Sequence, residues 1–88
     1  MEELRKRIDN IDELLSELFF ERMSVIKQIA DFKSKNNIAI ENLSREKEII
    51  KRLNKDKIYL KDLFPKFMTN LFEISKVYQE LLIKEEEK

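Results

Sequence analysis

Residues 4–32 read LRKRIDNIDELLSELFFERMSVIKQIADF, and apolar side chains recur along them at alternating steps of four and three. This spacing is typical of the apolar seam of one long helix. The members of the seam are Leu4, Ile8, Ile11, Leu15, Leu18, Val25, Ile29 and Phe32. One position of the seam, Arg22, has no apolar side chain. A guanidinium in a packed seam is costly unless an anion meets it, so the sequence predicts an anionic partner for Arg22.

The composition predicts a single all-helical domain, residues 1–88. Charged residues make up 41% and hydrophobic residues 42% of the chain, and the apolar spacing is helical. Glycine is absent, which argues against tight hairpins and phosphate-cradling loops. Cysteine and histidine are also absent, which excludes disulfides, thiol nucleophiles and imidazole chemistry. Any enzyme built from this chain therefore works without a nucleophilic triad.

The charge pattern indicates neither a nucleic-acid partner nor a membrane partner. The 18 lysines and arginines balance the 18 acidic residues, and the two signs are interspersed along the chain. No segment approaches the ~20 consecutive apolar residues that cross a bilayer. The first residues, MEE, lack the basic-then-apolar pattern of a signal peptide, so we expect a cytoplasmic protein.

The apolar periodicity predicts a long helix followed by a short one. The long helix runs from about residue 3 to about residue 35, and residues 36–42 form a loop. The short helix is capped by Asn42 or Ser44 and continues to about residue 55. Its apolar face consists of Leu43, Ile49, Ile50 and Leu53.

A third helix is expected after a link at residues 56–61. Asp62 is its predicted N-cap, which places Pro65 at the third helical position, where no intrahelical N–H is lost. This helix continues to about residue 84. The charged residues 84–88 are expected to fray in solvent.

The length of the first helix predicts a second chain. A helix of about 32 residues is ~48 Å long. A compact globule of this size has a radius of gyration of ~12 Å and spans only ~30 Å. Because the seam stays apolar along the whole helix, we expect an intertwined homodimer with two-fold symmetry to cover it.

Polar residues on the first helix suggest a ligand site. Lys33 follows Arg22 by 11 residues, which places both on one helix face about 16 Å apart along the axis. Arg5 lies about 100° away from Arg22 around the helix, so it is poorly placed to share a site within its own chain. In a dimer, Arg5 can reach the site of the partner.

The other two helices carry further polar candidates. Ser75 and Gln79 are four residues apart in an otherwise apolar stripe of the third helix, and they need hydrogen-bond partners there. Arg45 and Glu46 lie near the start of the second helix, off its apolar face. The stripe of the third helix consists of Met68, Phe72, Ser75, Gln79 and Leu82.

Each candidate also has a purely structural explanation. A seam arginine can pair with a buried glutamate or fix helix register, and Lys33 can complement the helix dipole. Ser75 and Gln79 can serve helix specificity, and Arg45 and Glu46 can form a solvated face. Together, three cations, a carboxylate and two neutral hydrogen-bonding groups suggest a small dianionic ligand. From the residue pattern alone, both a ligand site and a purely structural role stay open.

The ordered set of motifs resembles the all-helical AroQ class of chorismate mutases, with the bacterial three-helix dimer most similar. The resemblance covers nearly the whole chain. It is carried by LRKRIDNID at 4–12, similar to L-R-x-x-I-D-x-I-D, by Glu21-Arg22, IADFK at 29–33, SREKE at 44–48, LFEIS at 71–75 and Gln79. No single motif is specific, but their order and spacing are. The resemblance implies the rearrangement of chorismate to prephenate, a unimolecular step that requires no nucleophile, metal or cofactor.

The resemblance also implies catalytic roles on the first and third helices. Arg22 would grip one substrate carboxylate, and Arg5 of the partner subunit would hold another. Lys33 would bind a carboxylate and the ether oxygen, on which negative charge grows as the C–O bond breaks. Gln79 would donate a hydrogen bond to the same oxygen.

The remaining implied roles concern the ring of the substrate. Glu46 would accept the proton of the ring hydroxyl, Arg45 would help position that end, and Ser75 would bond the ring carboxylate. Asn42 stands where many members of the class have aspartate, so a backbone contact is the role carried over to it.

Two alternative functions are open. Isochorismate-pyruvate lyases of the same fold keep the cations and the glutamine but lack the glutamate found here at position 46, so Glu46 favours the mutase. A non-enzymatic helical dimerisation module is the other alternative. It predicts that Arg22→Ala or Arg22→Leu is neutral or stabilising, because only an unneeded buried charge is lost.

Overall fold

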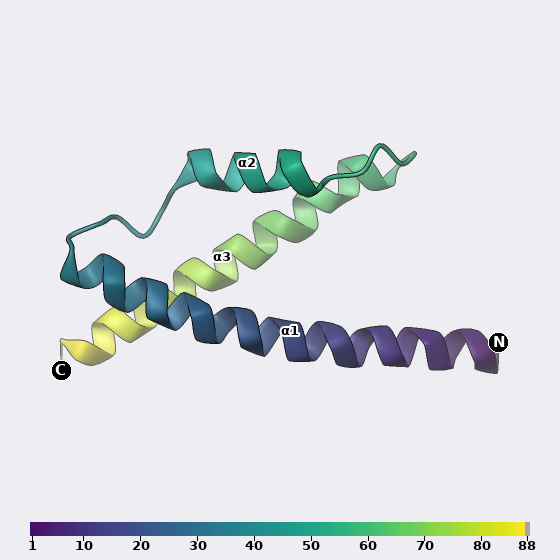
Figure 1. Cartoon of the computed structure of the whole chain (residues 1–88), viewed down its shortest axis with the longest axis horizontal. Helices are drawn as coiled ribbons and strands as arrows, with labels where there is room; N and C mark the ends of the chain where they lie inside the picture. Colours follow the sequence, from purple (N-terminus) through teal and green to yellow (C-terminus); the bar gives the residue numbers. More distant parts are fainter. Residues whose placement is uncertain (88) are drawn as a thin grey trace.

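The computed structural model describes residues 1–87 and consists of three helices (Figure 1). They are α1 (Glu2–Lys35), α2 (Leu43–Leu53) and α3 (Leu60–Glu86). Residues 1–87 form no strand, so the predicted all-helical, long–short–medium architecture is confirmed. Lys88, the last residue of the charged end, lies outside the described residues. The rest of that end does not fray as expected, because α3 continues through Glu86.

The chain is long and thin. Its extents are 51, 26 and 14 Å, and the 34 residues of α1 account for the longest of them at about 1.5 Å per residue. Figure 1 shows α3 beginning near the end of α2 and crossing the C-terminal half of α1, while the N-terminal half of α1 runs apart from both and its first turns extend past them. The radius of gyration, 16.1 Å, exceeds the ~12 Å of a compact chain of this length.

The buried core is small and lies where α1 and α3 cross. Its apolar members are Ala30, Met68 and Phe72, and two polar residues, Ser75 and Gln79, are buried with them. The interrupted stripe of α3 therefore faces inward, as its spacing predicts. Buried hydroxyl and amide groups require hydrogen-bond partners, so the crossing of α1 and α3 is the first place to look for a polar functional site.

The predicted seam of α1 is not covered by residues 1–87. Along its N-terminal half, Leu4, Ile8 and Ile11 remain 50–56% exposed. A contiguous exposed apolar surface of this length marks an interaction site. Among residues 1–87, no helix is both long enough and apolar enough to cross a membrane.

A Schellman motif ends α1 and turns the chain toward α2. Asn37 adopts the left-handed conformation, with φ of 55°, which asparagine tolerates better than most residues. The backbone N–H of Ile38 then donates to Lys33 O at 2.9 Å, and that of Asn37 donates to Ser34 O at 3.5 Å. The resulting loop carries Ile40 and the residues after it back over the crossing.

Asn42 caps α2. Its side-chain Oδ1 accepts a hydrogen bond from the backbone N–H of Arg45 at 3.1 Å, which satisfies one of the free donors of the first turn. Of the two predicted caps, Asn42 and Ser44, the structure therefore uses the first. Helix α2 ends at Leu53, two residues before the expected end.

The predicted start of α3 is wrong. Asp62 is not the N-cap, because α3 begins at Leu60, directly after Tyr59, whose φ is 66°. Tyr59 is the centre of a tight turn, with ψ of −40°, in which Leu60 N–H donates to Ile58 O at 2.8 Å. Lys61 N–H donates to Lys57 O at 3.0 Å, and helical geometry begins three residues early. Asp62 lies in the first turn instead, where its charge complements the helix dipole.

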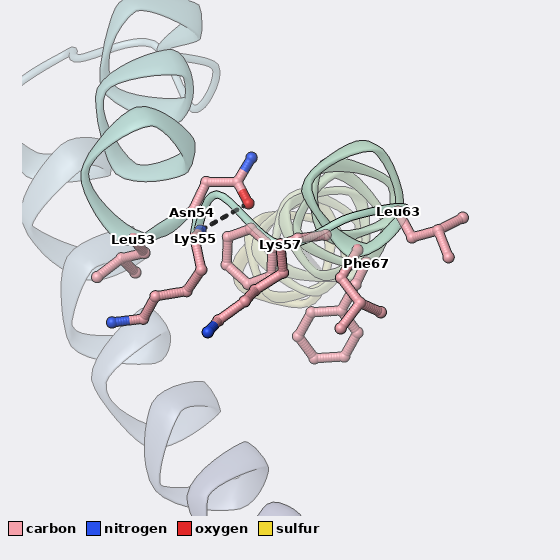
Figure 2. Close-up of a pocket in the computed structure, with 8 residues that line it drawn as sticks. Leu53, Asn54, Lys55, Lys57, Leu63 and Phe67 are labelled. Atoms are coloured by element: carbon pink, nitrogen blue, oxygen red, sulfur yellow. Dashed lines mark hydrogen bonds between the residues drawn. The ribbon is translucent and has the colours of Figure 1, made fainter.

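The earlier start also moves Pro65 to the sixth position of α3. There its missing N–H leaves the carbonyl of Lys61, four residues back, without an intrahelical donor. The side-chain Nδ2 of Asn54 supplies the replacement, since it donates to Lys61 O at 2.9 Å. Figure 2 shows Asn54 at the rim of the apolar pocket between α2 and α3, where its Oδ1 accepts from Lys55 N at 2.9 Å.

We expect Asn54→Ala to lower the free energy of unfolding by about 0.5–1 kcal/mol, because the Lys61 carbonyl loses its donor. In a Pro65→Ala background the same change should cost less, because the N–H of the new alanine can donate to that carbonyl. Urea unfolding of the four proteins at one protein concentration measures both losses. Equal losses in the two backgrounds would contradict the link between Asn54 and Pro65.

Candidate active site

A cavity of about 270 Å³ lies where α1, α2, α3 and the loop before α2 meet. Seven of the eight predicted site residues line it: Arg22, Lys33, Asn42, Arg45, Glu46, Ser75 and Gln79. Lys76 and apolar side chains supply the rest of the wall; Val25, Ile29, Ile49 and Phe72 are among the apolar ones. A small, mostly apolar pocket with a few converging polar groups is typical of a site for a small molecule.

Arg22 lies at the inner wall, held by α3. Its Nη1 donates to Ser75 Oγ at 2.5 Å, and Ser75 Oγ in turn donates to Leu71 O at 2.9 Å. The guanidinium also lies 6.0 Å from the centre of the Phe72 ring. Burial lowers the pKa of Arg22. No carboxylate of residues 1–87 forms an ion pair with this guanidinium. The structural alternative, a buried glutamate, is therefore absent within this part of the chain.

Lys33 lies at the end of the cavity nearest the loop. Its Nζ donates to Ile40 O at 2.9 Å, and none of the ion pairs within residues 1–87 includes it. A lysine has three donors, so two remain for a ligand. Lys33 is half-buried and has free donors for an anion, and its bond to Ile40 O fixes where its ammonium lies.

Among the neutral residues of the cavity, Gln79 gives the clearest indication of a ligand contact. Its side chain is buried, with 4% of the residue exposed, one helical turn from Ser75. The Oε1 atom is buried and has no hydrogen-bond partner among residues 1–87. A buried amide oxygen without a donor costs about 1–3 kcal/mol. Natural proteins rarely keep such a group without a functional reason, so Gln79 is a candidate ligand contact.

The α2 wall contributes Asn42, Arg45 and Glu46. The Asn42 side chain is occupied by the cap, and Arg45 Nη1 pairs with Glu48 Oε1 at 2.9 Å along the helix surface. Glu46 Oε2 forms an ion pair with Lys76 Nζ at 3.1 Å. This contact joins α2 to α3 across the cavity.

Lys76 lines the cavity and was missed by the sequence analysis. Its neighbour Ser75 was found because it interrupts an apolar stripe, whereas a lysine beside the stripe resembles a solvated residue. Nothing in the spacing indicates that its ammonium meets Glu41 and Glu46 from another part of the chain. Those carboxylates raise the pKa of Lys76 above its ordinary value. Glu41 contributes most to this increase, and Glu46 contributes next.

Arg5 does not reach the cavity of its own chain. It lies on the projecting half of α1, where its Nη1 meets Glu2 Oε1 at 3.5 Å and its side chain is 66% exposed. The predicted separation of Arg5 from Arg22 within one chain is therefore confirmed. Its place in the site of a partner subunit stays a prediction.

Comparison with known proteins identifies the family of the chain. The model of the family described as chorismate mutase type II matches residues 4–83. The chain belongs to this family. The match begins at the first seam leucine and ends beyond Gln79, so it includes every residue of the cavity. Membership of the chorismate mutase type II family confirms the resemblance seen in the sequence motifs.

Two proteins similar to this chain have chorismate mutase in their names. A bifunctional chorismate mutase/prephenate dehydratase of Aquifex aeolicus is 48% identical over 59 residues, which is 64% of this chain and 16% of the relative. A chorismate mutase of Methanocaldococcus jannaschii is 42% identical over 53 residues, which is 60% of this chain and 54% of the relative. The matched region thus spans about half of one relative and a sixth of the other. No solved structure matches the chain significantly.

Proposed function

We propose that this chain is a chorismate mutase, which converts chorismate to prephenate. The observation that carries the proposal is a single cavity that brings together Arg22, Lys33, Glu46 and Gln79. These residues come from three helices and are separated by up to 57 positions in the sequence. The family match and the names of the two relatives support the same activity.

The reaction is an intramolecular rearrangement. One ether C–O bond breaks, one C–C bond forms, and no proton or electron enters or leaves the substrate. Catalysis therefore depends on holding the reactive conformer and stabilising the charge that separates in the transition state. The cavity suits this task because its walls are largely apolar and its polar groups are fixed by contacts with helices or the loop.

Each polar group has a role in this proposal. Arg22, oriented by Ser75, binds one substrate carboxylate, and its lack of a protein anion leaves the guanidinium available. Lys33 and Gln79 bind the ether oxygen, on which negative charge grows. Glu46 accepts the hydrogen bond of the ring hydroxyl, and Arg45 positions that end of the substrate.

Asn42 and Ser75 act mainly through their neighbours. The cap formed by Asn42 fixes the first turn of α2, from which Glu46 projects, and its backbone contributes the wall beside the ring. Ser75 contributes its hydroxyl to the ring carboxylate while it holds Arg22.

The active assembly in this proposal is a homodimer. The exposed seam of α1 supplies the apolar surface that a second copy would cover, and two-fold pairing is the simplest way to bury it. In that arrangement Arg5 of the partner subunit completes the cation set around the second carboxylate. The free position of Arg5 on the projecting half of α1 supports this assignment.

One assay tests the proposed function. Purified protein should consume chorismate, followed by its absorbance, and the product should be identified as prephenate. Parallel incubation with isochorismate distinguishes the mutase from a lyase, which would release pyruvate. If a folded dimer converts neither chorismate nor isochorismate, the non-enzymatic dimerisation module is the remaining function.

The proposal predicts that kcat/KM for chorismate is nearly constant between about pH 6 and pH 8, because the amide of Gln79 does not titrate. Burial lowers the pKa of Arg22, but a guanidinium stays protonated in this range. The raised pKa of Lys76 means that its ion pairs, present at lower pH, are lost only at strongly alkaline pH. A steep fall of the rate across this range would contradict the assignment of Gln79.

A further inference from the structure

We propose that Lys76 is a positioning residue for Glu46, which it holds by one carboxylate oxygen so that the other can meet the substrate. This inference rests on the proposed function. It concerns a residue that no sequence motif singled out and that lies in the wall of the cavity. Four observations support it: the geometry of the ion pair, the burial of both partners, the local charge, and the tether to the loop.

The ion pair engages only one oxygen of Glu46. Lys76 Nζ lies 3.1 Å from Oε2, and no hydrogen bond or ion pair with residues 1–87 engages Oε1. An ion pair at one oxygen limits the directions in which the other oxygen can point. That is the geometry required of a group that accepts a hydrogen bond from a hydroxyl in a defined place.

Both partners are sheltered from water. The side chain of Lys76 is 15% exposed and that of Glu46 is 18% exposed, whereas the other surface pairs of this chain are more than half exposed. Exposed pairs contribute little order because solvent screens them. A sheltered pair that joins α2 to α3 is a stronger constraint on side-chain position.

The local charge argues against direct binding of substrate by Lys76. Three carboxylates surround its ammonium: Glu41 at 2.9 Å, Glu46 at 3.1 Å and Glu73 at 3.5 Å. These acids more than neutralise the cation, so it offers little attraction to an anionic ligand. Without Lys76, the three carboxylates would repel one another, and Glu46 would move away from its present position.

Glu41 extends the same cluster to the loop. It immediately precedes Asn42, the cap of α2, and its bond to Lys76 ties this part of the chain to α3. The loop also supplies Ile40 O, which holds Lys33. Lys76 therefore fixes the start of α2, from which Glu46 projects, as well as the carboxylate itself.

The test compares Lys76→Met with Lys66→Met, a matched change at an exposed lysine of the same helix. We expect Lys76→Met to lower kcat/KM for chorismate by about 10- to 100-fold, since small displacements of a positioned group have effects of this size. Lys66→Met should match the wild type. Lys76→Arg should recover most of the activity, because arginine can also pair with the carboxylates.

A double-mutant cycle identifies the residue through which Lys76 acts. If it acts through Glu46, then Lys76→Met combined with Glu46→Gln should be no less active than Glu46→Gln alone. Additive losses would show direct contact of Lys76 with the substrate and would overturn the proposal. Wild-type activity in Lys76→Met would also overturn it.

Hydrogen exchange gives a readout that does not depend on turnover. Backbone amides of residues 41–46 should exchange faster in Lys76→Met than in Lys66→Met, because the tether between the loop and α3 is lost. Equal exchange in the two variants would overturn the proposal. If the wild-type protein does not convert chorismate, the proposed function fails, and this exchange result alone decides whether Lys76 orders the segment that carries Glu46.

Discussion

Replacing Arg22 with leucine is expected to lower kcat/KM for chorismate by about 100- to 1000-fold while the helical fold is retained. The loss follows because the guanidinium is assigned to a substrate carboxylate in a largely apolar cavity, where one charged donor has an effect of this size. Chorismate turnover and far-ultraviolet circular dichroism of the purified variant measure the two quantities.

The stability of this variant distinguishes a ligand site from a structural site. Arg22 has no carboxylate partner within residues 1–87, and its one side-chain hydrogen bond goes to Ser75, which keeps its own bond to Leu71. Leucine restores the apolar seam and removes a partly buried charge, so the free energy of unfolding should be unchanged or higher. Urea unfolding at fixed protein concentration measures it.

Arg7→Leu is the matched control on the same helix, because Arg7 is exposed and does not line the cavity. It should keep wild-type activity. Full activity in Arg22→Leu would refute the site assignment, and unfolding of Arg22→Leu would show that the arginine has a structural role. Loss of turnover from an active wild type, with stability retained, is the outcome that the mutase predicts. The dimerisation module also predicts a stable variant, but no chorismate turnover in the wild type.

The sequence predicts faces of helices better than contacts between them. The spacing of the α3 stripe places Ser75 and Gln79 on a buried face, and both are buried in the structure. The same spacing cannot give the partner of Ser75, since Arg22 lies 53 residues away in the chain. That contact depends on where α1 and α3 cross, which is set by the packing of the whole chain.

The start of α3 was predicted wrongly because the local signals were ambiguous. Aspartate is a good N-cap and proline favours the first turn, so Asp62 followed by Pro65 suggested a helix with its N-cap at residue 62. The actual start depends on Tyr59 with a positive φ, which is uncommon for residues other than glycine and asparagine. The side chain of Asn54 then compensates for Pro65, and this contact also depends on tertiary structure.

Lys76 shows a different limit of prediction. It is one of 18 cationic residues in the chain, and its position beside the stripe is typical of a solvated lysine. Its role is visible only when the loop brings Glu41 and α2 brings Glu46 to the same ammonium. Charged residues at the border of an apolar stripe are therefore the part of such a site that sequence patterns identify least well.

Arg5 should be as important for turnover as Arg22, although it lies outside the cavity of its own chain. We expect Arg5→Ala to lower kcat/KM by about 100-fold or more, because Arg5 of the partner subunit is assigned to the second substrate carboxylate. Its ion pair with Glu2, at 3.5 Å, is exposed, so the fold should not depend on it. Chorismate turnover and circular dichroism measure both effects.

Mixing the two inactive proteins tests whether the site is shared between subunits. In a dimer of one Arg5→Ala chain and one Arg22→Leu chain, both changes fall in the same site and the other site is intact. Random exchange at equal amounts makes half of the dimers mixed, so about a quarter of the wild-type activity should return. Differently tagged chains, separated after exchange, show how many mixed dimers form.

If mixed dimers form and stay inactive, Arg5 does not act across the interface. In that case the exposed seam of α1 has a partner other than this chain, or pairs in a geometry that keeps Arg5 away from the substrate.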